Sequence, residues 1–431
     1  MNLELASIVL LGSLLLLLAL GVEIAVSMGI VATIGLVFFV HKSIGEFAYA
    51  AWGYMNSFTL TAVPLFVFMG AVFSNTGTIT ALFRGAERLI GFLPGGIASS
   101  VLGANAIFGA ICGSSVAAAA TFGKIAYPEM ERLGYDPRLS LGSIAVGGTL
   151  SVLIPPSVIM IFYGSWEQVS VARLFAAGLI PGVLLAMLLI ATVVIMVMLN
   201  RSLAPRSMKY TWKDRLIALK EIGPFAVVIV LILGVIFGGI MTPTEGASMG
   251  AAISIIFAAA YRKMTFQALK ASMWSAMKIT AMIAYVAFTA SVLGMVFQYL
   301  GLTDAFSAFM TALPLGKYGI FAIICVMYLI LGCFFDSFSM LVLTLPFISP
   351  IIRSLGFDAV WFGIVYVVLA EIGLVTPPFG LNLFVLNSVV PQHGVMTIAR
   401  GALPFLLPLG VLIVLLTIYP QIALWLPGVL Y

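Results

Sequence analysis

The sequence predicts an all-helical protein that crosses a membrane many times, with about ten transmembrane helices and two re-entrant hairpins in two repeats. Of its 431 residues, 63% are hydrophobic and only 8% are charged, too few for a surface that faces water. Long runs of Leu, Ile, Val and Ala lack the alternation of membrane β-strands, so the backbone must be hydrogen-bonded within helices. Motifs that recur about halfway along the chain predict the repeats.

Transmembrane helices are predicted wherever the chain stays apolar for roughly 20 residues, the length that crosses a bilayer core. The first such run could imitate a signal peptide, but no basic segment precedes it, so we interpret it as a retained helix. The ten predicted helices cover residues 5–20, 24–40, 60–73, 139–163, 174–199, 224–240, 247–261, 279–300, 360–390 and 404–426.

Two further apolar stretches, 97–133 and 320–355, are interrupted in the middle by small polar residues. The first arm, 97–111, would be about 22 Å long at 1.5 Å per residue, which is short of a bilayer core of about 30 Å. Both stretches are therefore expected to be re-entrant hairpins, with a kinked spanning pair as the alternative. Segments 78–93 and 302–311 have helical amphipathic spacing and are either interfacial helices or loops.

The charges predict the orientation of the chain. If both hairpins return to their own side and the N-terminus is outside, all but four of the 20 Lys and Arg residues lie in inner loops, as the positive-inside rule expects. Both termini are then external. Basic residues spread through loops in this way argue against a nucleic-acid partner. The four outer basic residues are Lys42, Arg173, Lys317 and Arg353.

Self-similarity divides the chain into two halves, 1–215 and 222–431, joined by the polar stretch 201–221. Leu133-Gly134-Tyr135-Asp136 recurs as Leu355-Gly356-Phe357-Asp358, 222 residues later, and Pro155-Pro156 recurs as Pro377-Pro378 at the same offset. Each half has five spanning helices, so the second half enters from the opposite side and the repeat is inverted. Secondary transporters use such repeats, with interrupted helices at the midplane, for alternating access.

The chemistry is predicted where each hairpin tip faces a helix broken by its proline pair, at 139–163 and 360–390. Proline frees carbonyl oxygens, which can coordinate a hard cation such as sodium, and the helix N-terminus after each tip favours a carboxylate substrate. The sodium candidates are Gly113, Ser114, Ser115, Thr149, Pro155, Pro156, Asp336, Ser337, Ser339, Thr376, Pro377 and Gly380. The substrate candidates are Ser115, Ser157, Asp336, Ser337 and Asn382, and Ser151 belongs to the first site.

Three polar positions carry open alternatives. Asp336 at membrane depth indicates function, although it could instead cap the next helix near the surface. Glu371, within an apolar run, is either a second coupling carboxylate or a structural glutamate. Asn382 and Asn387 either line the pathway or bond between helices. Glu23 and Glu245, at equivalent turns, are expected to pack or cap at helix ends.

Enzyme chemistry is disfavoured. Gly246 to Gly250 satisfies G-x-S-x-G, but a nucleophile elbow needs a preceding strand and a histidine partner, and here the motif lies in a predicted membrane helix. No cofactor is expected. The cysteines, Cys112, Cys325 and Cys333, show neither metal-ligand spacing nor a disulfide framework.

The segment Gly109 to Ala118, followed by Ile154-Pro155-Pro156-Ser157 and by Leu174 to Gly182, resembles the large permease (M) subunit of the TRAP (tripartite ATP-independent periplasmic) transporters, within the ion-transporter superfamily. The second-half segment Thr376 to Asn382 is also similar to that family, and the resemblance covers nearly the whole chain.

The resemblance implies a bacterial inner-membrane protein that takes up an organic acid by an elevator mechanism driven by sodium. Hairpins and broken helices would form the transport domain and the other helices the scaffold. It also implies two partners, a small four-helix membrane (Q) subunit and a periplasmic substrate-binding protein. Family substrates include sialic acids, C4-dicarboxylates, other keto and hydroxy acids and sulfonates. A stand-alone sodium/dicarboxylate symporter is the main alternative, and a passive channel is another.

Overall fold

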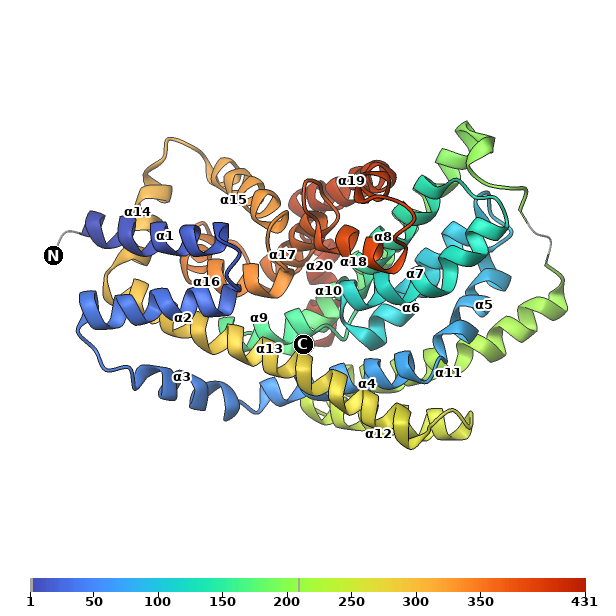
Figure 1. Cartoon of the computed structure of the whole chain (residues 1–431), viewed down its shortest axis with the longest axis horizontal. Coiled ribbons are helices and arrows are strands. Elements are labelled where there is room, and N and C mark those ends of the chain that lie inside the picture. The colour runs from blue at the N-terminus through green and yellow to red at the C-terminus, as the bar shows by residue number, and fades with distance from the viewer. Residues whose placement is uncertain (1–2, 208–209) are drawn as a thin grey trace.

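The computed structural model describes residues 3–207 and 210–431, and this part of the chain contains helices and no strands (Figure 1). The helices before the polar connection are α1 (Leu3–Ala19), α2 (Ile24–Ile34) with a π-helical continuation (Gly35–Val40), α3 (Glu46–Met55), a short 3-10 turn (Thr59–Thr61), α4 (Ala62–Asn75), α5 (Ile79–Ile90), α6 (Gly96–Cys112), α7 (Ser115–Arg132), α8 (Pro137–Leu153), α9 (Val158–Glu167), α10 (Val171–Leu199) and a second 3-10 turn (Arg201–Leu203). Those after it are α11 (Trp212–Phe237), α12 (Pro243–Ala260), α13 (Phe266–Tyr299), α14 (Leu302–Ala312), α15 (Lys317–Gly332), α16 (Ser337–Ser354), α17 (Ala359–Leu374), α18 (Leu381–Val389), α19 (Val395–Ile418) and α20 (Gln421–Leu430).

The number of helices that can span a membrane differs from the ten expected from the sequence. Within the described residues, six helices are long and apolar enough to cross a bilayer, or seven if α3 and α4, which are bent by 66°, count as one. Other apolar helices have only 10 to 17 residues. The multi-spanning helical class is therefore confirmed, while length supports only five of the ten expected spans, or six with the bent pair. One of the six long apolar helices, α16, was expected as a hairpin arm rather than a span.

Several helix boundaries differ from the sequence prediction, because capping side chains rather than hydropathy set them. Helix α13 begins at Phe266 instead of residue 279, where the Thr265 hydroxyl accepts a hydrogen bond from the amide of Ala268. Helix α11 begins inside the polar stretch, with a capping box between Thr211 and Asp214. Helix α3 was not expected, and the last predicted span, 404–426, covers parts of α19 and α20.

The two halves share helix positions and caps. Helices α7 and α16 both have 18 residues and begin 222 residues apart. Each begins with a side-chain cap, since Ser114 accepts a hydrogen bond from Ala117 and Asp336 accepts two, from the amides of Phe338 and Ser339. The main difference is that α3 and α4 form a bent pair where α13 is one helix of 34 residues.

Both amphipathic segments are helical, as α5 and α14. Helix α5 packs closely on α11, where a Cβ on Gly85 would lie 3.2 Å from the carbonyl oxygen of Ala218. The Arg88 guanidinium forms an ion pair of 2.8 Å with Glu221 in the same contact. Burial raises the pKa of the neighbouring Glu87 carboxyl above its ordinary value.

Helices α8 and α17 form the interior of the fold. Every residue of α17 from Val360 to Leu374 is buried, and the apolar part of the α8–α9 pair is completely buried. Small residues allow backbones to touch here: a Cβ on Gly142 of α8 would lie 2.1 Å from the carbonyl oxygen of Gly401 on α19. The interrupted helices therefore lie at the centre, where water is excluded.

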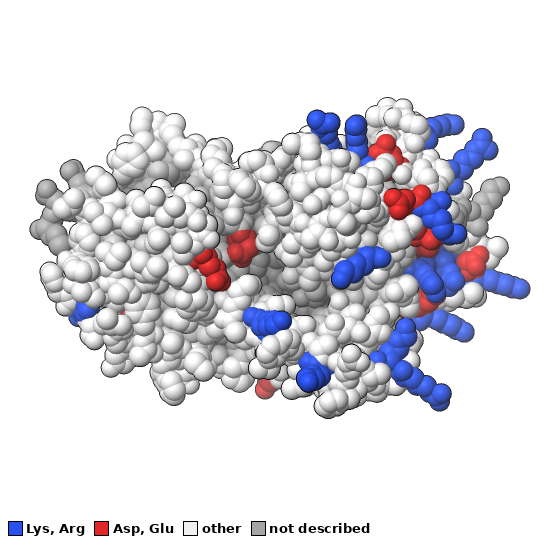
Figure 2. All heavy atoms as spheres, viewed as in Figure 1, with Lys and Arg blue, Asp and Glu red and all other residues white. Residues whose placement is uncertain are grey.

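Charge is distributed unevenly over the surface. Figure 2 shows Lys and Arg side chains gathered at one end of the molecule, the end that α5 and α11 occupy in Figure 1. The opposite end, with α1, α2 and α14, is nearly free of charge in this view and carries the N-terminus.

Candidate ion and substrate site

The first hairpin tip lies directly against the first helix break. Gly113, in the left-handed region with φ of 61°, ends α6, and a Cβ there would lie 3.3 Å from the carbonyl oxygen of Pro156. The carbonyl oxygen of Ser115, just past the tip, lies close to Gly148 of α8: a Cβ on Gly148 would be 2.6 Å from it. Side chains at Gly113 of the tip and at Gly148 of α8 would crowd these contacts, so the tip backbone packs directly on the broken helix.

The second hairpin tip contacts the second break in the same manner. The amide of Gly380, two residues after the proline pair, donates a hydrogen bond of 3.2 Å to the carbonyl of Cys333 and so joins the break to the tip. Gly332 and Gly373 pack against each other, since a Cβ on Gly373 would lie 2.4 Å from the Cα of Gly332. Asp336 caps α16, which was the alternative to a functional role predicted for this residue. Its Oδ1 accepts hydrogen bonds of 3.0 Å from the amides of Phe338 and Ser339.

A buried carboxylate lies beside the two tips. Glu371, 1% exposed, accepts a hydrogen bond of 3.1 Å on Oε1 from the Ser337 hydroxyl of the second tip. The Ser115 hydroxyl of the first tip lies near this carboxylate, while the hydrogen bond among the described residues comes from Ser337. Ser115 and Ser337 are equivalent in the repeat, 222 residues apart. Tyr366 strengthens the contact by donating its hydroxyl to the carbonyl of Ser337.

The site carries buried oxygen atoms that a cation or a polar ligand can use. Glu371 Oε2, Ser157 Oγ and Asn382 Oδ1 have no hydrogen-bond partner among the described residues, and all three residues are at most 1% exposed. Leaving such groups unpaired is costly in a water-free interior. Carboxylate, hydroxyl and amide oxygens are suitable ligands for a hard cation. Asn382 also links the halves, through a 3.4 Å bond from Nδ2 to the carbonyl of Ala145 on α8.

The two tip regions differ in charge. At the repeat offset, Ser114 corresponds to Asp336 and Thr149 to Glu371. The first region therefore has neutral hydroxyls where the second has two carboxylates. A cation is attracted more strongly to the second region, and an anionic substrate is less repelled by the first.

The structure brings most of the predicted residues together around the tips and breaks. Pro155-Pro156 and Pro377-Pro378 separate α8 from α9 and α17 from α18, and both bonds are cis. Ser339 is buried at the start of α16. The Thr149 hydroxyl instead donates to the carbonyl of Val146 within α8, and the Thr376 hydroxyl, just past α17, donates to the carbonyl of Ile372.

Other predictions meet a mixed outcome. The serine of the G-x-S-x-G motif lies within helix α12, where Ser248 donates to the carbonyl of Thr244. The three cysteines are free. Glu245 caps α12 as expected, but Glu23 forms no side-chain cap at α2.

Sequence reasoning missed Asn105. Its side chain is fully buried, lies against Gly147 of α8, and has an unpartnered Oδ1. An amide in the apolar run Ala104-Asn105-Ala106 was the available signal. Asn387 likewise has a buried, unpartnered Oδ1.

Interrupted interior helices lined with unpaired oxygen atoms, in a helical protein with several membrane spans, define the class of secondary membrane transporters. The particular family follows from the sequence: residues 11–422 match the profile of the "Tripartite ATP-independent periplasmic transporter, DctM component". The chain belongs to this family of multi-pass membrane proteins, and it is a transporter permease, not an enzyme. A tripartite system has two further components beside the permease.

Curated relatives agree with this assignment. The C4-dicarboxylate TRAP transporter large permease protein DctM of Vibrio cholerae is 32% identical over 95% of both chains. The sialic acid TRAP transporter permease protein SiaT of Haemophilus influenzae is 34% identical over 87% of this chain and 61% of its own length. The isethionate TRAP transporter permease protein DctMQ of Oleidesulfovibrio alaskensis is 31% identical over 97% of this chain and 66% of its own length.

Two solved structures share the fold. The YdaH transporter of Alcanivorax borkumensis superposes with a TM-score of 0.61 over 87% of both chains, at 14% identity. Neisseria gonorrhoeae MtrF superposes with a TM-score of 0.53 over 86% of this chain and 83% of its own, at 11% identity.

Proposed function

We propose that this chain is the substrate-translocating permease of a three-component system that takes up an organic acid by sodium symport. The observation that carries the proposal is the buried Glu371 carboxylate, which accepts a hydrogen bond from Ser337 of the second tip and lies near Ser115 of the first. A group that lies beside both tips can make their arrangement depend on a bound cation. That dependence is what coupling between ion and substrate requires.

Sodium is the proposed coupling ion because the site offers oxygen ligands. The second region, with Asp336 and Glu371, supplies the negative charge, and carbonyls at both breaks complete the ligand set. The first region, with Ser114, Ser115 and Ser157, leaves an uncharged surface for the substrate carboxylate, and Asn382 lies between the halves to bind it. Ion and substrate then neutralise one another in a site of low dielectric constant.

An elevator movement of two inverted repeats is the proposed mechanism. The common helix lengths, caps and breaks of α6–α9 and α15–α18 support a transport domain made of both hairpins and both broken helices. The remaining helices would form the scaffold. The Lys and Arg end in Figure 2 would face the cytoplasm of a bacterium across its inner membrane, and both termini are proposed to be periplasmic.

The partners and the substrate class are proposed by analogy with the relatives. A four-helix Q subunit is supported by the relative named DctMQ, which is longer than this chain. A periplasmic binding protein would deliver the acid. C4-dicarboxylates, sialic acid and isethionate, named for the relatives, are the acids to test first.

The decisive experiment is uptake by proteoliposomes. The permease, purified with its small subunit, would be supplied with succinate, N-acetylneuraminate or isethionate on the cognate binding protein, with and without an inward sodium gradient. We expect uptake that needs both sodium and the binding protein. Sodium-driven uptake without the binding protein would indicate a stand-alone symporter, and uptake indifferent to sodium would refute the coupling.

A further inference from the structure

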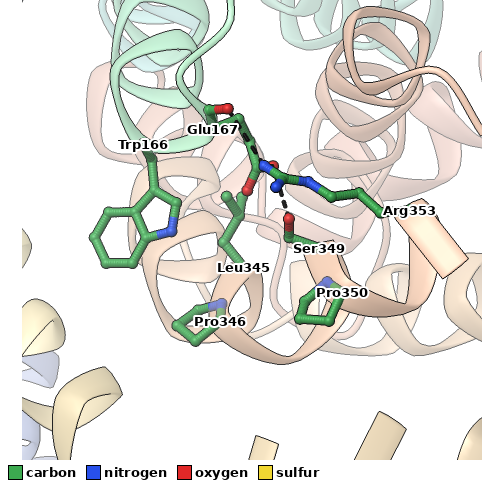
Figure 3. A pocket seen from close by; sticks show the side chains of 7 residues that line it. All are labelled: Trp166, Glu167, Leu345, Pro346, Ser349, Pro350 and Arg353. Atoms are coloured by element: carbon green, nitrogen blue, oxygen red, sulfur yellow. Dashed lines mark hydrogen bonds and ion pairs between the residues drawn. The ribbon is translucent and has the colours of Figure 1, made fainter. Parts of the chain in front are cut away.

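A pocket of about 410 Å³ lies apart from the tips, between the end of α9 and the second half of α16 (Figure 3). It joins the two halves of the chain, since α9 precedes the polar connection and α16 follows it. Its lining is Trp166, Glu167, Leu345, Pro346, Ser349, Pro350 and Arg353.

The polar side chains of this pocket are arranged around one carboxylate. Glu167 is buried, and its Oε2 accepts hydrogen bonds of 2.7 Å from both the Ser349 hydroxyl and the Arg353 guanidinium. The Arg353 side chain is 60% exposed, whereas that of Glu167 is 3% exposed. Figure 3 shows the guanidinium reaching across the pocket to the glutamate. An incoming anion can therefore approach the guanidinium from the open side.

The pocket is connected to the second hairpin tip through aromatic contacts. The ring centroids of Trp166 and Phe162 are 5.9 Å apart, and those of Phe162 and Phe338 are 4.6 Å apart. The amide of Phe338 bonds to Asp336 at the tip. At 1.5 Å per residue, Leu345 is about 10 Å along α16 from Phe338. The near edge of the pocket is therefore roughly two helical turns from the tip, and Arg353 lies about 22 Å along the helix from Phe338.

The lining suits an organic acid. A guanidinium binds a carboxylate or a sulfonate through two parallel hydrogen bonds, and Trp166 offers an apolar face. Pro350 has no amide hydrogen, so the carbonyl of Pro346, a residue that also lines the pocket, lacks its helical donor. That oxygen can accept a hydrogen bond from a substrate hydroxyl group.

We propose that this pocket is a second binding site, which holds the organic acid on its way to the hairpin tips. The anionic group of the acid binds guanidinium donors of Arg353 that Glu167 does not use, and Glu167 keeps its bonds to Arg353 and Ser349. The identity of the ligand as the transported acid, and the placement of the pocket on the outer side, rest on the proposed function.

Substitutions of the two charged residues test the proposal because they have opposite expected effects. Glu167→Gln frees Arg353 while Ser349 can still donate to the amide oxygen, so the KM for uptake should fall about threefold. Arg353→Gln removes the anion partner, so KM should rise about tenfold. Arg353→Lys keeps the charge but loses the planar fork, and should lie between. Arg173→Gln, at another exposed arginine, is the matched control and should leave KM unchanged.

Binding can be measured separately from transport. Succinate, N-acetylneuraminate and isethionate would be titrated onto the purified permease while tryptophan fluorescence is recorded. At least one acid should change the fluorescence, and the change should be lost in Trp166→Phe but retained in Trp425→Phe, a control at an exposed tryptophan.

The outcomes separate this proposal from the proposed function. If Glu167→Gln and Arg353→Gln shift KM in the same direction or not at all, the pair is a structural link and the second site is refuted. The second site is refuted as well if none of the three acids causes a fluorescence change that depends on Trp166. Trp166-dependent binding without any sodium-driven uptake by the wild-type protein would support the pocket and overturn the proposed function.

Discussion

Replacing Glu371 with Gln removes the carboxyl group whose charged form a cation would bind between the hairpin tips, and changes little else. The side chain is 1% exposed, so water cannot substitute for the lost charge. The Ser337 hydroxyl, 3.1 Å from Oε1, can still donate to the amide oxygen of Gln. The variant therefore separates the charge of the residue from its hydrogen bond, whereas Glu371→Leu removes both.

The expected magnitude follows from the environment of the carboxylate. Oε2 has no hydrogen-bond partner among the described residues and is the oxygen available to a cation. An interaction with a charged hydrogen-bonded group contributes about 1.5–3 kcal/mol. At 1.4 kcal/mol for each factor of ten, Glu371→Gln should raise the sodium concentration for half-maximal uptake by roughly 10- to 150-fold.

The assay is uptake by proteoliposomes over a series of sodium concentrations, with thermal unfolding of the same preparations to establish folding. Glu245→Gln is the control, because Glu245 is an exposed helix-capping glutamate at α12. It should leave the sodium dependence unchanged. A folded Glu371→Gln protein with wild-type sodium dependence would show that the carboxylate is structural and refute the coupling role.

Three further predictions concern the tips and the polar connection. Gly373→Ala should lower stability by about 1–3 kcal/mol, because the new Cβ would lie 2.4 Å from the Cα of Gly332; thermal unfolding in detergent measures this, and Gly410→Ala, with open space around it, should cost nothing. Asp336→Ala should destabilise α16 by about 1 kcal/mol and abolish sodium-driven uptake. Asp336→Ser should restore the cap, as Ser114 provides it in the first half, but should not restore uptake. Restored uptake would mean that capping is the whole role of Asp336. Hydrogen bonds from Thr211 lower the pKa of Asp214 below its ordinary value of 3.8. The contribution of Asp214 to the stability of α11 is therefore present above pH 3.8 and is lost as the pH falls through the lowered pKa. The melting temperature of Asp214→Asn should lack this part of the acid dependence, and pH profiles identical to wild type would contradict the assignment.

The amino-acid sequence by itself determined the helical membrane class and the places where helices break. Both are local properties: apolar runs have the length of a bilayer, and the prolines at 155, 156, 377 and 378 cannot continue a helix. The tip residues Ser114 and Asp336 were predictable for the same reason, since small polar groups interrupt apolar runs there.

Only the tertiary structure decided which polar groups meet. Glu371 was visible as a carboxylate in an apolar run, but its position beside two serines depends on packing between α17 and both hairpins. The ion pair of Glu167 with Arg353 joins residues 186 positions apart, and neither has an unusual local sequence. The start of α13 followed its Thr265 cap rather than hydropathy. Contacts between segments that are distant in the chain depend on how the interior helices pack against each other. That packing cannot be read from the composition or spacing of any one segment.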